Sequence, residues 1–161
     1  MKVTDIVTMA GVNRSTFYLH FASVDDLKCQ LENQLISDFR AIEHEFRLCE
    51  IDKNPELVLN KINNLLLSDL KLYRMLLSSD HATTLSRRMR EAIKQSISNN
   101  FQVMKYITDI NKFRMVVEYI TGGVFSVYIA WIQGLINCDI EYITEYCASL
   151  IINGLKGAIR Y

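Results

Sequence analysis

The sequence has little glycine and almost no proline, with six glycines and one proline among 161 residues. β-Sandwiches and barrels need many turns that contain these two residues, so their scarcity favours a helical protein. Hydrophobic residues make up 50% of the chain and charged residues 22%. This balance is typical of a globular protein and argues against a disordered segment. The length predicts one domain, or two small ones at most.

The chain also lacks net charge, because 18 basic side chains are balanced by 18 acidic ones. No overall positive field attracts nucleic acid, so any such binding must come from a local surface. The cysteines, at positions 29, 49, 138 and 147, form no Cys-x-x-Cys pair, and the first residues do not resemble a secretory signal. We therefore expect reduced thiols in a cytoplasmic protein.

Charged residues are absent from one long stretch, residues 119–138. Its twenty residues reach transmembrane length. The stretch contains Gln133 and Asn137, however, and neither end carries the Lys/Arg cluster that orients a membrane span. We expect burial inside a protein assembly and no membrane partner, and a membrane-associated helical protein is the open alternative.

Apolar residues recur at helical spacing along the whole chain, and no strand-like alternation is present. Thr4, Asn13 and Ser23 are the expected N-caps of the first three helices. The pattern predicts an all-α fold with helices over residues 4–10, 14–20, 24–50, 55–66, 70–77, 85–104, 111–136 and 139–159.

The first two of these helices are short and joined by a tight Ala10-Gly11-Val12 turn. This arrangement predicts a helix-turn-helix, whose second helix enters the major groove of DNA. Asn13, Arg14, Ser15 and Thr16 stand at the N-terminal end of that second helix. Side chains of these types contact base edges and phosphates.

The run from Val3 to Phe21, VTDIVTMAGVNRSTFYLHF, resembles the DNA-binding signature of TetR-family (tetracycline-repressor-like) regulators. The Ala-Gly-Val turn, the Thr-Phe-Tyr-x-His-Phe run and the Ser-x-x-x-Leu start of the next helix match in order and spacing. The family usually has one more helix before this run, and the printed sequence lacks it.

The resemblance implies a DNA-binding head over residues 1–30 and a C-terminal helical ligand and dimerisation domain over residues 31–161. It implies contacts of Asn13, Arg14, Ser15 and Thr16 with bases and backbone. It also implies phosphate contacts by Thr4, Tyr18 and His20, and Lys28 completes the predicted DNA-binding set. The implied function is a transcriptional regulator, most often a repressor, controlled by a small molecule.

The charge of the head points to an alternative. Over residues 1–31, three basic side chains (Lys2, Arg14 and Lys28) are cancelled by Asp5, Asp25 and Asp26. Because DNA affinity depends heavily on neutralising phosphates, a neutral head predicts weak binding. The alternative is a dimeric ligand-binding or interaction protein of the TetR fold that no longer binds operator DNA.

The second half of the chain offers large side chains on core-facing stretches of several helices. Ligand sites in helical proteins lie between helices and are mostly apolar. We expect a pocket for a small apolar or weakly polar effector, lined by Tyr73, Phe101, Met104, Tyr106, Tyr119 and Trp131. No cofactor is predicted. His20, His44 and His81 give no metal-ligand spacing, and the chain contains no catalytic motif, so we expect neither a metal site nor an enzyme.

The last two expected helices carry apolar residues on more than one face. A single small core cannot cover all of them, so we expect a homodimer in which these helices form a four-helix bundle. The expected interface contains Val117, Val124, Tyr128, Trp131, Ile143, Cys147, Leu150, Ile151 and Gly154. Such a dimer would present two recognition helices roughly 34–36 Å apart to double-stranded DNA with a palindromic operator.

Overall fold

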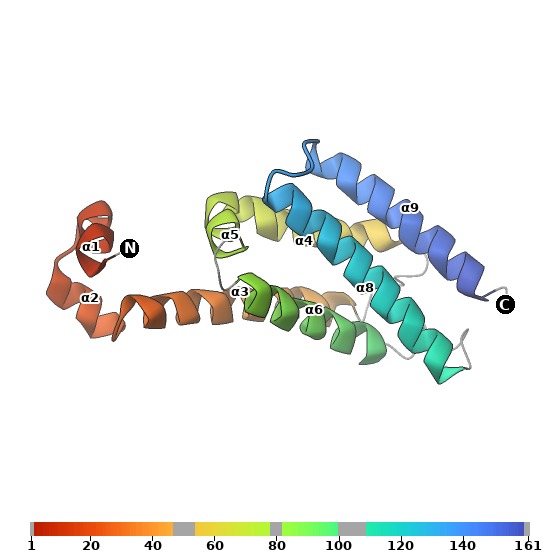
Figure 1. Ribbon diagram of the computed structural model, residues 1–161, viewed down its shortest axis with the longest axis horizontal. Coiled ribbons are helices and arrows are strands. Elements are labelled where there is room, and N and C mark those ends of the chain that lie inside the picture. Colours follow the sequence, from red (N-terminus) through yellow and green to blue (C-terminus); the bar gives the residue numbers. More distant parts are fainter. Residues whose placement is uncertain (1, 47–53, 78–81, 100–108, 160–161) are drawn as a thin grey trace. The chain divides into compact units, whose positions relative to one another are not determined.

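The computed structural model describes residues 2–46, 54–77, 82–99 and 109–159. These residues contain eight helices and no strand. The predicted all-α fold class is confirmed. The helices are α1 (Val3–Ala10), α2 (Arg14–His20), α3 (Val24–Phe46), α4 (Pro55–Ser68), α5 (Leu70–Leu77), α6 (Ala82–Asn99), α8 (Ile110–Ile132) and α9 (Ile140–Ile159) (Figure 1).

The chain divides into two compact units, an N-terminal unit of residues 1–37 and a C-terminal unit of residues 38–161. The division falls inside α3, seven residues after the boundary expected from the sequence. α3 therefore contributes residues to both units.

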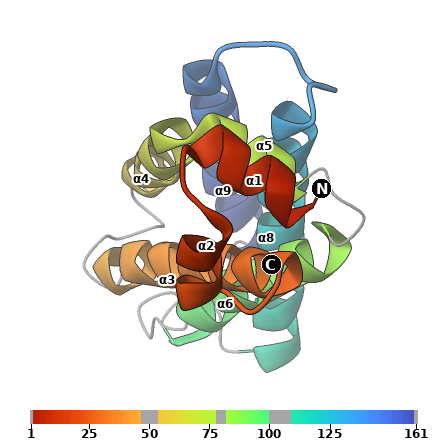
Figure 2. The same ribbon diagram turned by 90° about the vertical axis from the view of Figure 1, so that its left-hand side faces the viewer.

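The N-terminal unit begins with a helix whose cap differs from the prediction. α1 starts at Val3, so Lys2 is its N-cap and Thr4 lies within the first turn. The prediction of Thr4 as the cap was wrong because the Asp5 carboxylate accepts the Lys2 backbone N–H at 2.8 Å and starts the helix earlier. α1 ends at Gly11, whose φ of 68° is left-handed and suits glycine. Figure 2 shows α1 and α2, in red, on either side of this turn.

Aromatic rings of α2 and its C-cap cluster around the buried residue of this short helix. Phe17 is buried, as is Val7 on α1. The Phe17 ring meets the rings of Tyr18 and Phe21, with centroids 5.4 Å away in each case. The next helix is capped as predicted, since the Ser23 hydroxyl accepts the Asp26 backbone N–H at 3.1 Å.

The C-terminal unit is organised around α8, which packs against α5, α6 and α9, while α4 packs against α9 and α5. α8 and α9 run side by side in opposite directions (Figure 1). The Asp109 carboxylate caps α8 by accepting the Asn111 and Lys112 backbone N–H groups at 2.8 and 3.3 Å. α8 ends before the left-handed Gly134 (φ 76°), earlier than the predicted Ile136.

A chain of buried polar side chains links three helices of this unit. The Tyr128 hydroxyl on α8 donates to Asn63 Oδ1 on α4 at 2.8 Å, and Asn63 Nδ2 donates to Thr144 Oγ1 on α9 at 2.6 Å. The Thr144 hydroxyl in turn donates to the Ile140 carbonyl at 3.0 Å. Burial raises the pKa of Tyr128 to about 12. Fully paired polar groups of this kind favour one arrangement of the helices over others.

An ion pair joins α6 and α8 nearer the surface. Lys94 Nζ lies 2.7 Å from a Glu118 carboxylate oxygen and 3.1 Å from one of Glu91. The hydrogen bond to Glu118 raises the pKa of Lys94. The side chain of Glu118 is largely exposed, so we expect only a small contribution to stability.

Candidate functional site

The N-terminal end of α2 is exposed, as the helix-turn-helix prediction requires. Asn13, Arg14 and Ser15 are exposed and Thr16 is half-buried. Asn13 Oδ1 accepts the Thr16 backbone N–H and the Thr16 hydroxyl, both at 2.9 Å, and also the Ser15 hydroxyl. The predicted cap at Asn13 is confirmed. Arg14 is the longest side chain at this edge and the one best suited to reach a guanine.

The remaining predicted DNA contacts lie on all three helices of the N-terminal unit. Tyr18 and His20 are exposed on α2, with Tyr18 58% accessible. Thr4 on α1 and Lys28 on α3 are half-buried. The structure therefore gathers the eight predicted residues in one unit, with five of them exposed.

Two acidic side chains of the N-terminal unit are turned toward backbone donors. Asp5 accepts the Lys2 N–H, and Asp26 accepts the Ala22 N–H at 2.8 Å. Carboxylates placed at helix starts interact favourably with the helix dipole. These acids thus have a local structural role, although their charge still offsets that of Arg14 and Lys28.

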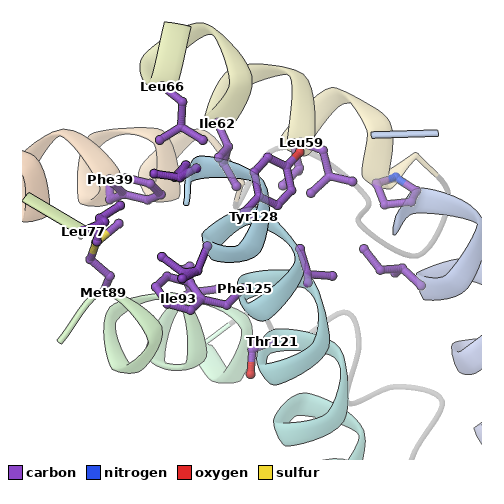
Figure 3. Close-up of a pocket in the computed structure, with 16 residues that line it drawn as sticks. Phe39, Leu59, Ile62, Leu66, Leu77, Met89, Ile93, Thr121, Phe125 and Tyr128 are labelled. Carbon is purple, nitrogen blue, oxygen red and sulfur yellow. The ribbon is translucent and has the colours of Figure 1, made fainter. Parts of the chain in front are cut away.

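A cavity of about 90 Å³ lies in the C-terminal unit, among residues of α3, α4, α5, α6, α8 and α9 (Figure 3). Aliphatic and aromatic side chains form nearly all of its wall. The lining residues are Phe39, Pro55, Val58, Leu59, Ile62, Leu66, Leu77, Met89, Ile93, Thr121, Val124, Phe125, Tyr128, Ile129, Ile132 and Ile151.

Of the six residues predicted for a ligand pocket, the structure describes Tyr73, Tyr119 and Trp131, and these three are not among the residues that line this cavity. Tyr73 is buried in the core, and burial raises its pKa. Trp131 is also buried, with its indole N–H donating to the Cys138 carbonyl at 2.9 Å. Tyr119 is 73% exposed and belongs to another groove. Phe101, Met104 and Tyr106 lie outside the described residues.

That groove, of about 130 Å³, runs between α8 and α9. Tyr119 and Leu150, 73% and 56% exposed, are its exposed large apolar side chains. The rest of the lining is formed by Ile120, Gly123, Val124, Val127, Cys147 and Ile151.

Most residues predicted for the dimer interface are covered within the chain itself. The buried ones are Val117, Tyr128, Trp131, Ile143, Cys147 and Ile151, with Val124 and Gly154 half-buried. A side chain already covered by its own chain has little area left to bury on association. Leu150, at 56% exposure, is the predicted residue that still presents a large apolar surface. The predicted set does not include the other exposed large apolar side chains of α8 and α9, which are Ile110, Met115, Tyr119, Tyr142 and Tyr146.

Comparison with known proteins agrees with this architecture. The TetR family model described as "Transcriptional regulator C-terminal region" matches residues 53–153. The chain belongs to the TetR family of transcriptional regulators. No curated protein and no solved structure matches it significantly.

The matched region of this TetR regulator covers most of the C-terminal unit, including every cavity-lining residue except Phe39. It does not reach α1, α2 or α3. The DNA-binding assignment of the N-terminal unit therefore depends on its own sequence and geometry.

Three further features of the TetR regulator bear on its chemistry. No metal-binding group of three His, Cys, Asp or Glu side chains occurs among the described residues. Cys29, Cys138 and Cys147 are free thiols, and burial raises the pKa of Cys147. α8 is the one described helix long and apolar enough to cross a membrane, but core helices pass the same test, so it is weak support for a span.

Proposed function

We propose that this TetR regulator is a cytoplasmic, homodimeric, non-enzymatic repressor that binds a palindromic operator through α2 and is controlled by a small molecule in the C-terminal unit. One observation carries the DNA-binding part of the proposal. In a chain of a regulator family, a short helix follows a left-handed glycine and presents Asn13, Arg14 and Ser15 to solvent.

The roles of the α2 side chains follow from their chemistry. The Arg14 guanidinium can form two hydrogen bonds to the O6 and N7 atoms of guanine. Tyr18 and His20, which follow on the same helix, supply donors for phosphate oxygens. Arg14 therefore reads sequence, whereas Tyr18 and His20 position the helix on the backbone.

The outer face of α8 and α9 supports dimerisation. Its apolar side chains Met115, Tyr119, Tyr142, Tyr146 and Leu150 are each more than half exposed. The rings of Tyr142 and Tyr146 lie against each other at a tilt of 38°, with centroids 5.2 Å apart. A second copy would cover these side chains through a twofold interface, which would present two α2 helices to successive major grooves.

The cavity supports ligand control through α3. Phe39 lines the cavity and lies on α3, two residues beyond the division between the units. A ligand that moves Phe39 therefore acts on the helix that also belongs to the N-terminal unit. Control requires the ligand to bind the DNA-competent and DNA-incompetent states with different affinities.

Operator binding can be tested by selecting sequences from a random double-stranded DNA pool at about 50 mM salt, followed by fluorescence anisotropy on the selected site. We expect Arg14→Ala to weaken the selected site by about 1–3 kcal/mol and to relax one base position. Tyr18→Phe or His20→Ala should weaken all sequences alike. Arg74→Ala removes the same charge from an exposed position of α5 and should leave affinity unchanged.

Equal, sequence-independent losses in the Arg14, Tyr18 and His20 variants would contradict base reading by α2. The balanced charge of residues 1–31 favours a second candidate, a dimeric ligand-binding or interaction protein without operator binding. A folded dimer that selects no DNA even at low salt would establish that alternative.

A further inference from the structure

We infer that the cavity takes an uncharged, purely apolar ligand: a small hydrocarbon-like molecule, or the hydrocarbon end of a larger one, held without a hydrogen bond. This inference rests on the proposed function, because it treats the cavity as the effector site of the regulator. It narrows the ligand from the apolar or weakly polar molecule that the sequence suggests to a single chemical class.

The wall offers almost no side-chain polar atoms. Of the sixteen lining residues, only Thr121 and Tyr128 carry a side-chain oxygen or nitrogen. None of the lining residues, all of which belong to the described part of the chain, is charged. A charged ligand would therefore lose its hydration in this cavity and find no ionic partner.

Both hydroxyl groups of the wall already donate their hydrogen to another group of the protein. The Thr121 hydroxyl donates to the Val117 carbonyl of its own helix at 2.6 Å. The Tyr128 hydroxyl donates to Asn63 Oδ1, within the polar chain that continues to Thr144. A ligand acceptor that took either hydrogen would have to break one of these bonds. For a ligand donor, the wall side chains offer only the lone pairs of these two hydroxyl oxygens.

The charged side chains between α6 and α8 are likewise paired with each other. Lys94 follows the lining residue Ile93 on α6, and its ammonium binds the carboxylates of Glu118 and Glu91. The Tyr128 phenol, whose pKa burial raises to about 12, is uncharged as well. These neighbours of the cavity thus add no free charge that would attract a polar ligand.

The size of the cavity sets what can enter without a structural change. An apolar cavity of about 150 Å³ stays dry and binds benzene or xenon. At about 90 Å³, this cavity should accept xenon as it stands, whereas a ligand of benzene size must displace part of the wall. Figure 3 shows Phe39 beside Leu77 and Met89 at one end of the cavity, so Phe39 is a wall residue whose displacement would reach α3.

The test uses the full 161-residue chain with xenon, benzene and phenol as probes. Xenon binding to the native chain is followed by ¹²⁹Xe NMR. Ile93→Ala, which enlarges the cavity, is titrated with benzene and with phenol by calorimetry. We expect saturable xenon binding, and benzene binding at least about tenfold tighter than phenol, because the phenol hydroxyl would lose its hydration and the wall side chains offer it only the oxygens of Thr121 and Tyr128 as acceptors.

Two matched variants locate the binding. Ile93→Phe, or Ile62→Phe if the first variant does not fold, should reduce xenon affinity more than about tenfold by filling the cavity. Ser126→Ala in the Ile93→Ala background removes a hydroxyl from an exposed position of α8 that is not part of the cavity wall, so both titrations should be unchanged. Phenol binding as tight as benzene, or xenon binding unaffected by filling, would overturn the inference.

Selection of DNA, carried out on the same preparation, separates this inference from the proposed function. A chain that selects DNA but binds neither xenon nor benzene refutes only the ligand class. A chain that binds both probes with the expected preference but selects no DNA refutes the regulator proposal and leaves the ligand class in place.

Discussion

The buried polar chain gives a prediction whose size can be worked out from its bonds. Tyr128→Phe removes only the hydroxyl that donates to Asn63 Oδ1 at 2.8 Å, and it leaves the shape of the core unchanged. The buried acceptor then lacks this donor, which costs about 1–3 kcal/mol. For a chain of this length, each kcal/mol lowers the melting temperature by about 2–4 °C.

The partner substitution should be more damaging. Asn63→Leu leaves the Tyr128 hydroxyl without its acceptor and also removes the donor to Thr144 at 2.6 Å. We expect a loss of about 2–4 kcal/mol, because two buried contacts are broken. The double variant should lose about 1–2 kcal/mol less than the sum of the two single losses, since each substitution removes a group that the other has left unpaired.

Urea unfolding followed by the fluorescence of Trp131, the single tryptophan, reports on this unit. Protein concentration must be held constant, because dimerisation would add to apparent stability. Tyr142→Phe removes a hydroxyl from an exposed tyrosine of α9 and should stay within about 0.5 kcal/mol of the native chain. A neutral Tyr128→Phe together with additive losses in the double variant would refute the stabilising role of the polar chain.

Three further predictions concern pH, backbone conformation and salt. Burial raises the folded-state pKa of Tyr128 from 10.0 to about 12, so its contribution to folding stability is complete below pH 10 and is lost as pH rises toward 12. Between pH 10 and 12, the urea midpoint of the native chain should therefore fall more steeply than that of Tyr128→Phe. Parallel curves would contradict this prediction. Gly11 has a left-handed φ of 68°, and a Cβ added there would meet no other part of the chain within 4 Å. Gly11→Ala should therefore cost about 1–2 kcal/mol of folding stability through backbone conformation alone, which hydrogen exchange of α1 and thermal melts would detect. Gly123→Ala, on a helix with equal space, should be neutral or stabilising by up to about 1 kcal/mol in thermal melts. Lys94→Met should cost less than about 1 kcal/mol, and the difference from the native chain should vanish in about 1 M salt; a loss that persists in salt would indicate a packing role instead.

Local interactions explain what could be predicted from the sequence. The Asn13 cap depends on residues three positions apart, and α5 spans Leu70–Leu77 as its spacing predicted. The start of α1 was misjudged because two short-range caps competed, and the bond between Asp5 and the Lys2 N–H outweighed a cap at Thr4.

The covered faces of α8 and α9 could not be assigned from periodicity. A stripe containing Val117 and Ile143 predicts that a helix face is buried, but it does not say which surface buries it. Here α6 packs on α8 and α4 packs on α9 within the same chain, so these side chains belong to the core. The exposed tyrosines of α9 share their helix with this stripe but face away from it.

The cavity depends on side chains from six helices and is therefore a non-local property. The sequence predicts Tyr73 and Trp131 as pocket residues because they lie on core-facing stretches of helices, but in the structure both side chains are buried in the core. The space remains among aliphatic residues such as Ile62, Ile93 and Ile129. In sequence these residues have the same spacing as ordinary core positions.

The triple acceptance by Asn13 Oδ1 limits which residue can serve at that position. An aspartate there would accept the same three hydrogens and gain from the helix dipole, so it would be at least as good a cap. On a head that meets DNA, the same carboxylate would face the phosphates and repel them. Helix stability alone would therefore accept an aspartate at position 13, whereas DNA affinity would not. The neutral amide of Asn13 caps the helix without repelling the phosphates.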